Sequence, residues 1–501
     1  MPITVAVVGA GPVGLMLACE LKLNGVESVI LERLERPSGQ SRALGFNART
    51  AELLHQRGLL ERFLAEGTPV PVSHFAGLPM DLTKLDSRHK YTLSIAQFKV
   101  ERLLEEYAVE SGVEIRRGHE VVGLRQDDEG VVVSVDGGDG SYELRCEYLV
   151  GCDGGAGTVR GLAGIAFPGT GPKVHGILGD VASIETSVEF RTPLSYPGGI
   201  FGVAPIEPSG FRVTTIEYDV PTPSRGTPTL DELRESIRRV TGEDVRLGEA
   251  RWLSRFSDSA RLAERYRAGR VLLAGDAAHI HYPQSGQGMS LGIADAANLG
   301  WKLAAAVNGW APEGLLDTYH SERHPVGRSV LTNTEAQKAM TFPMDWVRDL
   351  RTLFQQLMGY DDVHRHIMEE VTGVGVRYAV PGGPSDERPG AAGTSLLGRR
   401  MPDLDLVTEA GGPTTVAELL RGGRGVLLVL SGDTPPPAVE RGWGDRVDVV
   451  GAKPAAPAPA AAVLIRPDGH VAWAGDVVDG TADGQRLLDA LAAWFGTARA
   501  N

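Results

Sequence analysis

The sequence predicts an α/β protein with three parts: a parallel sheet flanked by helices, an antiparallel sheet inserted into it, and a small α/β unit at the C-terminal end. Three observations support this class. The chain opens with an apolar strand, a glycine-rich turn and a helix. Residues 172–255 hold short apolar runs and show no helical period until about Leu230. Beyond residue 403, apolar runs return and a last helical pattern begins at Gly484.

The N-terminal motif is the most specific feature. The strand Ile3–Val8 leads into Gly9-Ala10-Gly11-Pro12-Val13-Gly14, which fits the spacing G-x-G-x-x-G. Gly9 permits the tight turn, Gly11 lets a pyrophosphate approach the backbone, and Gly14 lets the next helix pack on the sheet. A second strand, 28–31, delivers Glu32, where a carboxylate can accept hydrogen bonds from a ribose. These features favour a Rossmann-type dinucleotide site over a βαβ unit without ligand.

The remaining elements follow in chain order. We expect a helix over 50–67 interrupted near Gly58, strands and turns over 70–96, a helix over 97–110 and a strand meander over 113–150. After the inserted sheet and an amphipathic helix at 230–240, we expect a strand at 270–274 and helices at 288–308, 315–340 and 343–372. Residues 381–402, rich in Gly, Pro and Arg, form the best linker candidate, and 454–459 a loop.

Composition narrows the function classes. A formal charge of −14 argues against a nucleic-acid partner, which needs a basic face. Three cysteines without C-x-x-C spacing, no signal peptide and no long apolar run predict a cytoplasmic protein with no membrane partner. His279 and His281 lack a third ligand at suitable spacing, so we expect no metal site.

Two further motifs place Gly and Asp after an apolar strand. One is Gly151-Cys152-Asp153-Gly154, followed by Arg160; the other is Gly275-Asp276, followed by Gly286-Gln287-Gly288-Met289 at the start of a long helix. Small residues let backbone and carboxylate approach the hydroxyl groups of a ligand, and a helix N-terminus stabilises negative charge. Each motif alone is typical of a turn, but their joint order indicates one ligand site.

With these motifs the chain resembles the class A FAD-dependent aromatic hydroxylases, which share the p-hydroxybenzoate hydroxylase fold. It is most similar to aromatic polyketide hydroxylases of actinomycetes that carry a thioredoxin-like C-terminal domain. The resemblance implies a discontinuous FAD-binding domain (1–171 and 256–390), a substrate-binding β-sheet domain (172–255) and a thioredoxin-like domain (391–501). It also implies that Arg42 and Arg49 lie along the flavin. The implied FAD-binding residues are Gly9, Gly11, Pro12, Val13, Gly14, Glu32, Arg33, Arg42, Gln97, Arg102, Asp153, Asp276, Gly286, Gly288 and Met289.

The chain departs from the family pattern in one loop. The usual Pro-x-Gly-Gly-Gln-Gly-Met-Asn reads here as Pro283-Gln284-Ser285-Gly286-Gln287-Gly288-Met289-Ser290. Ser285 replaces a glycine, and Ser290 replaces an asparagine that would touch the flavin. Tyr282 stands where proline is commoner. The resemblance therefore implies flavin binding, but these departures mean that it does not fix the exact position of the flavin.

The implied function is a monooxygenase that tailors a polycyclic aromatic polyketide in antibiotic biosynthesis. NADPH or NADH would reduce FAD, and O₂ would give a flavin C4a-hydroperoxide that oxygenates the substrate. Two alternatives stay open: Baeyer–Villiger or ring-cleaving oxidation by the same species, and a flavoprotein that binds an aromatic antibiotic without oxygenating it. We expect a monomer or a homodimer.

No catalytic base can be assigned from the sequence. His281 and Tyr282 are candidates beside the third motif, and Tyr196 and Phe201 are candidate pocket residues in the inserted sheet. Core packing is an equally good interpretation of Tyr196 and Phe201. The C-terminal unit lacks a dithiol and cannot exchange thiols, so we expect it to pack or to form a dimer contact, and to be removable beyond Gly390 without loss of flavin.

Overall fold

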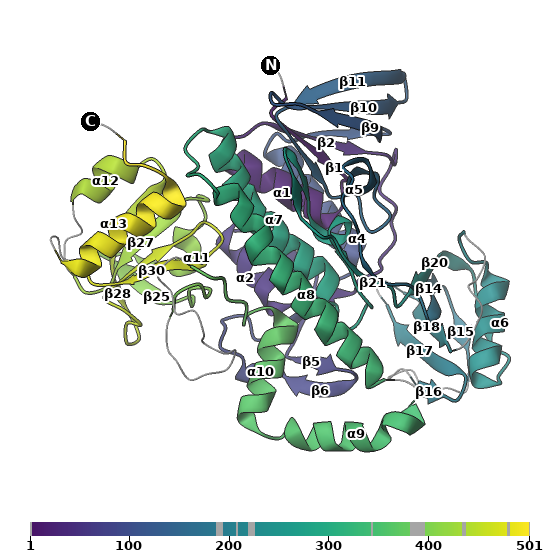
Figure 1. Ribbon diagram of the computed structural model, residues 1–501. Helices are drawn as coiled ribbons and strands as arrows, with labels where there is room; N and C mark the ends of the chain where they lie inside the picture. The colour runs from purple at the N-terminus through teal and green to yellow at the C-terminus, as the bar shows by residue number, and fades with distance from the viewer. Residues whose placement is uncertain are drawn as a thin grey trace.

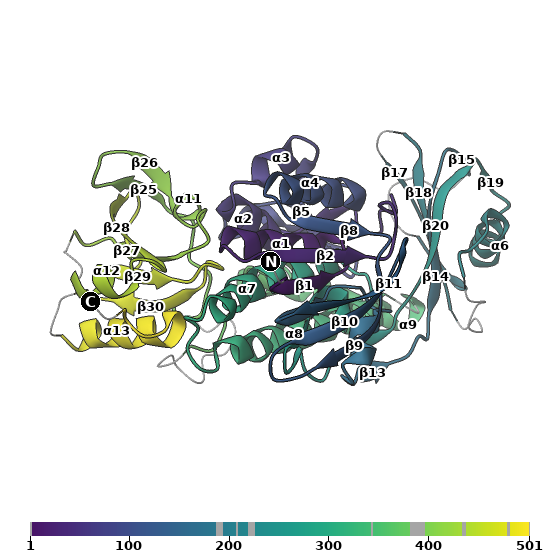
Figure 2. The ribbon, with the colours of Figure 1, turned by 90° about the horizontal axis from the view of Figure 1, so that it is seen from above.

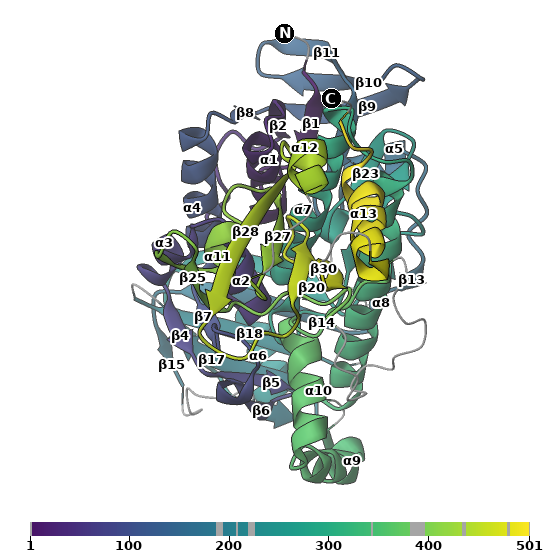
Figure 3. The ribbon, with the colours of Figure 1, turned by 90° about the vertical axis from the view of Figure 1, so that its left-hand side faces the viewer.

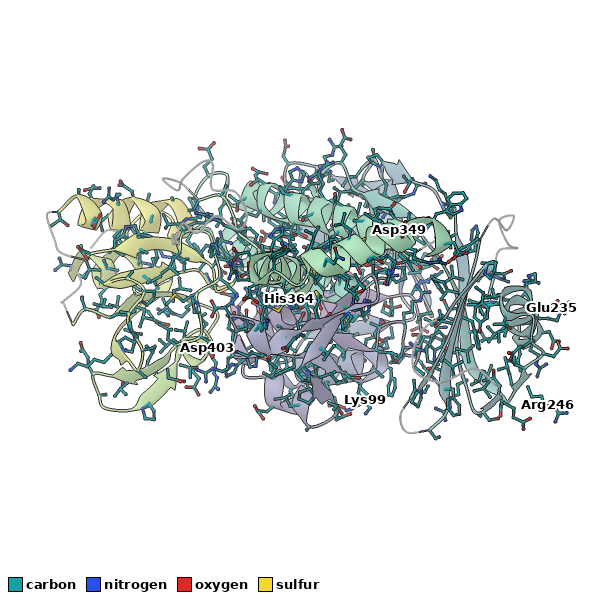
Figure 4. All side chains as sticks on the ribbon, turned by 90° about the horizontal axis from the view of Figure 1, so that it is seen from below. Lys99, Glu235, Arg246, Asp349, His364 and Asp403 are labelled. Carbon is teal, nitrogen blue, oxygen red and sulfur yellow. The ribbon has the colours of Figure 1, made fainter. Side chains whose placement is uncertain are left out.

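Three parts of the molecule lie in a row. The computed structural model describes residues 3–186, 194–206, 209–218, 226–341, 344–380, 396–432, 437–477 and 481–499. Seen from above, a central α/β body stands between an antiparallel sheet with its own helix and a C-terminal α/β unit (Figure 2). Figure 4 labels Glu235 and Arg246 at the outer end of the part with the antiparallel sheet, and Asp403 in the C-terminal α/β unit. The predicted fold class is confirmed.

The central sheet carries the N-terminal motif. Its strand order is β22-β23-β12-β1-β2-β8, and all neighbours except β22 run parallel. Every residue of β1 is buried, as expected for a parallel strand covered on both faces. The strands are β1 (Val5–Val8), β2 (Ser28–Glu32), β8 (Glu114–Arg117), β12 (Tyr148–Gly151), β22 (Arg267–Ala268) and β23 (Val271–Leu273).

Helices cover the central sheet. α1 (Pro12–Leu23) packs against α7 (Gln287–Val307) and α4 (Gln97–Glu110). The helix predicted over 50–67 is α2 (Ala48–Gln56) and α3 (Leu60–Leu64), and it breaks where predicted because Gly58 adopts φ +68°. The long helices α7 and α8 (Thr318–Ala339) cross the middle of the molecule (Figure 1).

Smaller elements complete the central body. The predicted meander forms a sheet of β9 (Glu120–Gln126), β10 (Val131–Gly137) and β11 (Gly140–Cys146). The other short elements are β3 (Gly45–Phe46), β4 (Thr68–Val70), β5 (Val72–Phe75), β6 (Leu78–Asp81), η1 (Leu82–Lys84), β7 (Thr92–Ser94), α5 (Thr158–Leu162), β13 (Gly169–Thr170), β21 (Ala260–Leu262), η2 (Gly275–Ala277), β24 (His279–Ile280) and η3 (Leu315–Asp317).

The inserted sheet is antiparallel, with the order β16-β17-β18-β14-β20. One face packs against the amphipathic helix α6 (Leu230–Thr241), which a Thr229–Glu232 capping box begins and Gly242 ends at φ +78°. Its strands are β14 (His175–Val181), β16 (Leu194–Tyr196), β17 (Gly199–Pro205), β18 (Phe211–Glu217) and β20 (Ala250–Ser257), with β15 (Ile184–Glu185) paired to β19 (Arg246–Leu247).

The stretch predicted as helical over 343–372 divides into α9 (Met344–Leu357) and α10 (Asp361–Thr372). The C-terminal unit holds a sheet in the order β26-β25-β28-β27-β29-β30 and lies in front of α7 when viewed from that side (Figure 3). Its elements are β25 (Asp405–Thr408), β26 (Pro413–Thr415), α11 (Val416–Leu419), β27 (Gly425–Val429), α12 (Pro437–Trp443), β28 (Val447–Pro454), β29 (Ala462–Ile465), β30 (Val471–Gly475) and α13 (Ala482–Phe495).

The domain limits stay predictions. Most of the predicted linker, 381–395, lies outside the described residues. Within the described part of the chain, none of the helices combines the length and apolar character needed to cross a bilayer.

Candidate functional site

All three motifs lie at one edge of the central sheet. β23, β12, β1 and β2 are adjacent and parallel, and their carboxyl ends deliver Gly275-Asp276, Cys152-Asp153, the glycine turn and Glu32. Backbone bonds hold these ends together: Cys152 N–H donates to Val8 O at 2.8 Å, and Gly9 N–H donates to Leu31 O at 2.8 Å. Ligands of open parallel sheets bind beyond this edge.

The glycine turn has the shape of a phosphate cradle. Gly9 has φ +106°, and a Cβ on it would lie 2.6 Å from Cys152 O. A Cβ on Gly14 would lie 2.0 Å from Gly9 O, whereas one on Gly11 would meet no atom within 4 Å. Gly11 is the N-cap of α1, with Pro12 in the first turn and no side-chain cap. The turn therefore needs Gly9 and Gly14 for its own packing and leaves open space at Gly11, where an anion can meet the helix N-terminus.

Glu32 lies beside this turn. Its Oε2 accepts a hydrogen bond from Ala10 N–H at 2.8 Å, and its Oε1 accepts one from Leu34 N–H at 2.9 Å. Each carboxylate oxygen keeps a second acceptor position. Its geometry fits the predicted ribose contact. Arg33, next in sequence, is exposed.

Arg160 joins the second motif to the third. Its guanidinium donates to Gly155 O at 3.0 Å and to Ala277 O at 2.8 Å. Asp153 Oδ2 accepts from Val159 N–H at 2.9 Å, but its Oδ1 is buried without a partner among the described residues. Burial raises the pKa of Asp153. An unpaired buried acceptor is costly, so it indicates a missing donor at this position, such as a ligand hydroxyl.

The third motif packs on the first. Gly275 has φ +63°, and a Cβ on it would lie 2.8 Å from Val13 Cγ2. Asp276 is exposed, so its carboxylate is free to receive hydroxyl groups. The predicted residues Gly9, Val13, Asp153 and Asp276 are therefore brought together.

Ser285 and Gly286 shape the loop before α7. Both adopt left-handed backbone, with φ +54° and +62°. This explains why glycine is usual at the position of Ser285. The Ser285 Oγ lies 2.8 Å from His74 O and 2.7 Å from Gln337 Oε1, and its single hydroxyl proton can be donated to either acceptor, which helps to hold the strained conformation. Ser290 Oγ accepts from Asn47 N–H at 3.2 Å. Met289 packs on the main core.

The three predicted FAD contacts Arg42, Gln97 and Arg102 have different surroundings in the structure. Gln97 Oε1 accepts from Ala43 N–H at 3.1 Å, which ties α4 to the segment that carries the exposed Arg42. Arg102 forms ion pairs with Glu66 and Glu106, so its predicted FAD contact would require these pairs to open and stays a prediction.

Arg49 does not lie free along the site. Its guanidinium donates to Glu52 Oε2 at 3.0 Å and to Asp468 O of the C-terminal unit at 2.8 Å, with its side chain buried. Its carbonyl partner places the Arg49 side chain against the C-terminal unit, and a contact between Arg49 and the flavin stays a prediction.

His281 and Tyr282 lie between the loop and the inserted sheet. His281 Nδ1 donates to Tyr282 O at 2.8 Å, and its Nε2 lies 3.3 Å from where a Cβ on Gly288 would be. Tyr282 packs in a small cluster with Val174, Ile200 and Ile216. Burial lowers the pKa of His281 and raises that of Tyr282. A lowered pKa keeps His281 neutral near pH 7, and because Nδ1 donates to Tyr282 O, its Nε2 is the nitrogen that can accept a hydrogen bond.

Tyr196 and Phe201 belong to the other face of the inserted sheet. Phe201 is fully buried in the cluster formed with α6, and Tyr196 packs against the same cluster. Alternate residues of a strand point to opposite faces, so Ile200 faces Tyr282 while Phe201 faces α6. Of the two interpretations left open, core packing against α6 describes where Phe201 lies, and a substrate contact for Phe201 or Tyr196 stays a prediction.

A buried carboxylate unassigned by sequence reasoning holds the third motif. Asp295, on α7, accepts from Gly275 N–H at 3.1 Å, from His279 Nε2 at 2.7 Å and from Arg323 Nε at 2.7 Å. Burial by itself would raise the pKa of Asp295, but Arg323 and His279 outweigh it and the pKa lies below its usual value. His279 is thus structural. Arg323 carried no signal in the sequence, since nothing in α8 marks it as buried.

A cavity of about 700 Å³ lies between the N-terminal half of α7, α8, α10 and the C-terminal unit. Its wall includes Asn47, Ser290, Tyr378 and His470. No sequence motif predicted it, because its residues come from α2, α7, α8, α10 and the C-terminal unit.

The arrangement fits FAD. The open backbone at Gly11 suits a pyrophosphate, Glu32 a ribose, and Asp153 with Asp276 a polyol chain. Among the described residues, no group of three or more His, Cys, Asp or Glu side chains could hold a metal ion.

Comparisons with known proteins agree with this fit. A family model described as FAD binding domain matches residues 2–334, and one described as aromatic-ring hydroxylase, C-terminal, matches 394–498. Rifampicin monooxygenase of Streptomyces venezuelae is 46% identical over 99% of each chain. The solved structure of OxyS anhydrotetracycline hydroxylase from Streptomyces rimosus is 42% identical, covers 100% of each chain and has a TM-score of 0.91. Dialkyldecalin synthase of Streptomyces rugosporus is 42% identical over 99% of each chain.

The two family models cover most of the chain, and the sheet edge carries a site that fits the cofactor they name. The predicted recognition and cofactor are therefore confirmed, and the chain belongs to the FAD-dependent aromatic-ring hydroxylases.

Proposed function

We propose that this enzyme hydroxylates a polycyclic aromatic polyketide, using NAD(P)H and O₂, in the tailoring of an antibiotic. The carrying observation is the meeting of the FAD-site loop with the inserted sheet at Tyr282, Ile200 and Ile216. Relatives named for rifampicin and anhydrotetracycline support a large multi-ring substrate.

The face of the inserted sheet opposite α6 offers mixed chemistry for such a substrate. It carries Leu178 and Thr214, both half-buried. It also carries Arg212, which forms an ion pair with Asp180 at 2.5 Å and donates to Arg42 O at 3.5 Å. Apolar surface can pack on fused rings, while hydroxyl and charged groups can bind phenol and carbonyl oxygens.

In this proposal the protein side chains bind and orient the substrate, and they exclude water from it. FAD supplies the electron transfer and oxygen activation when bound. Tyr282 closes the loop against the sheet and excludes water. His281 Nε2 is the atom that can take a phenol proton, because Nδ1 is occupied by the Tyr282 carbonyl. This role stays a prediction.

The test measures oxygen uptake with NADPH, with and without tetracycline-type and anthracycline-type aglycones, together with product mass. One added oxygen on a ring carbon is the expected result; an ester product would favour Baeyer–Villiger oxidation. Thr214→Phe should raise KM at least tenfold without changing FAD affinity, with Thr214→Ser as the control. NADPH oxidation that no aromatic substrate stimulates would contradict the proposal.

A second candidate is ring closure without oxygenation. It is favoured by one observation, the 42% identity to a protein named dialkyldecalin synthase. Substrate conversion at unchanged mass, without oxygen uptake, would distinguish it in the same assay.

A further inference from the structure

A buried cluster of charges joins the C-terminal unit to α7 and α8. Arg466, in the turn between β29 and β30, contacts Glu322 of α8 at 2.6 Å. Lys302 of α7 contacts the same carboxylate at 2.6 Å, and Asn298 of α7 donates to Asp468 Oδ2 at 3.0 Å. All five side chains are almost inaccessible to solvent. The C-terminal unit is therefore bonded to both long helices, not only packed against them.

Asp295 and Arg323, which hold the Gly275–His279 loop, lie on the same two helices. Arg323 is the residue after Glu322, and it donates to Asp295 Oδ1 and to Leu291 O at 3.1 Å. Because Asp295 accepts the Gly275 N–H, the position of Arg323 bears directly on the backbone that presents Asp276.

Tyr378 connects this arrangement to the C-terminal unit. Its hydroxyl accepts from Arg323 Nη1 at 3.1 Å, and its ring packs against the ring of His470 with centroids 4.2 Å apart and planes tilted by 32°. Arg466 lies over the same ring at 5.2 Å. Tyr378 N–H also donates to Gly398 O at 2.9 Å. Its hydroxyl thus serves the FAD loop while its ring is held by residues C-terminal to the predicted linker.

We propose that the C-terminal unit positions the FAD-binding loop Gly275–His279 through Tyr378, Arg323 and Asp295. In this role Arg466, Asp468 and His470 are positioning residues, since none lies at the sheet edge where FAD binds. The charges of this buried cluster are paired. Its three cations and three anions form ion pairs with one another, namely Lys302, Arg323 and Arg466 with Asp295, Glu322 and Asp468. Buried ion pairs add little net stability over apolar packing but can fix one register of helices, which is what a shared loop position requires.

The experiment measures FAD affinity of the full-length apoprotein by quenching of FAD fluorescence, with the thermal midpoint and the visible flavin spectrum of each variant. Tyr378→Phe removes only the hydroxyl that contacts Arg323. Asp468→Asn removes only the negative charge of Asp468, in the turn between β29 and β30 of the C-terminal unit. Both should raise the FAD Kd about five- to twenty-fold, a coupling typical of two linked sites.

The matched control is Arg446→Gln. Arg446 is also buried, but its guanidinium donates to Gly442 O, Phe495 O and Thr497 O, all inside the C-terminal unit. It should lower the thermal midpoint at least as much while leaving the FAD Kd within about twofold. If the FAD Kd instead follows the thermal midpoint in every variant, the C-terminal unit only stabilises the fold and the proposal is overturned.

A double-mutant cycle tests the route. Tyr378→Phe should have less effect on FAD affinity in an Asp295→Asn background, because the loop contact through which it acts is already weakened. Fully additive effects would overturn the route through Arg323 and Asp295. If Asp295→Asn fails to fold, the comparison with Arg446→Gln decides alone.

Discussion

Ser285 combines an unfavourable backbone conformation with a favourable hydrogen bond from its own hydroxyl. A non-glycine residue at φ +54° is strained, and its hydroxyl lies within hydrogen-bond distance of two acceptors, His74 O and Gln337 Oε1. The sequence revealed the exchange for glycine but not the two partners, because His74 and Gln337 lie more than 50 residues away in either direction.

Replacing Ser285 by Gly and by Ala separates the two effects. Both variants lose the hydroxyl, but only alanine keeps the backbone strain. We expect Ser285→Ala to unfold at a free energy about 1 kcal/mol lower than Ser285→Gly. Urea unfolding of both variants measures the difference, and equal stabilities would contradict the strained conformation.

We propose Asp276, in the third motif, as a ligand of FAD. It is exposed in the protein alone, so Asp276→Ala should leave the thermal midpoint of the apoprotein unchanged. It should weaken FAD binding at least about tenfold, since hydrogen bonds to a charged group contribute about 1.5–3 kcal/mol. Fluorescence titration measures the affinity; a variant that retains FAD as tightly as the wild type would argue against this carboxylate as a ligand.

At the scale of elements, close helix packing positions the loops. α7 approaches α1 and the third motif at Gly292, where a Cβ would lie 2.5 Å from Val13 Cγ2 and 3.2 Å from Gly275 Cα. The sequence predicted α7 almost to the residue from its apolar period, yet it could not show which face meets α1, because the helix is buried nearly all round.

Gly292→Ala should therefore separate α7 from the FAD loop. Neither neighbour is a flexible side-chain end, so we expect a loss of about 1–3 kcal/mol in unfolding free energy, as for overpacking, with weaker FAD binding. Gly161→Ala in α5 is the control, because a Cβ there meets nothing within 4 Å; it should be neutral or slightly stabilising. Wild-type affinity in Gly292→Ala would show that the contact is dispensable.

At the scale of the whole molecule, the structure changes the expectation for the C-terminal unit. Trp301 of α7 is fully buried against Trp494 and Phe495 of α13, with ring centroids 6.5 and 6.1 Å apart. Removing all residues after Gly390 would expose Trp301 to solvent. It would also leave Glu322 without its ion-pair partner Arg466.

We now expect the truncated chain to aggregate and to lose FAD, against the prediction made from the sequence. Breaking buried ion pairs is strongly destabilising because it leaves unpaired charges. Gel filtration measures the aggregation, and flavin absorbance measures the loss of FAD. Co-expression of residues 391–501 as a separate chain should restore both solubility and FAD binding. A soluble yellow truncation would show that the earlier expectation was right.

Acid should loosen the same contact. Burial lowers the pKa of His470 from 6.5 to about 4, so between these values the unfolded chain binds a proton that the folded chain does not. The free energy of unfolding should fall by up to about 3 kcal/mol as pH drops through this window. Burial would raise the pKa of Glu322, but Arg466 and Lys302 hold it at about 2, so its contribution is lost below pH 4.5 with the same sign.

His470→Phe keeps the stacking on Tyr378 and removes the titration. Urea unfolding at pH 7 and pH 4.5 should show a smaller loss for this variant than for the wild type. An equal loss would mean that other groups carry the acid dependence.

The sequence by itself determined the fold class, most helices and strands, and the three motifs of the predicted FAD site, because glycine spacing and apolar periods act over a few residues. Only the tertiary structure decided how those motifs meet, that Phe201 packs against α6 and Arg49 against the C-terminal unit, and that Asp295, Arg323 and Tyr378 link the Gly275–His279 loop to the C-terminal unit. These depend on which faces of distant elements come together, and burial of a charge is paid for by partners that local sequence does not name.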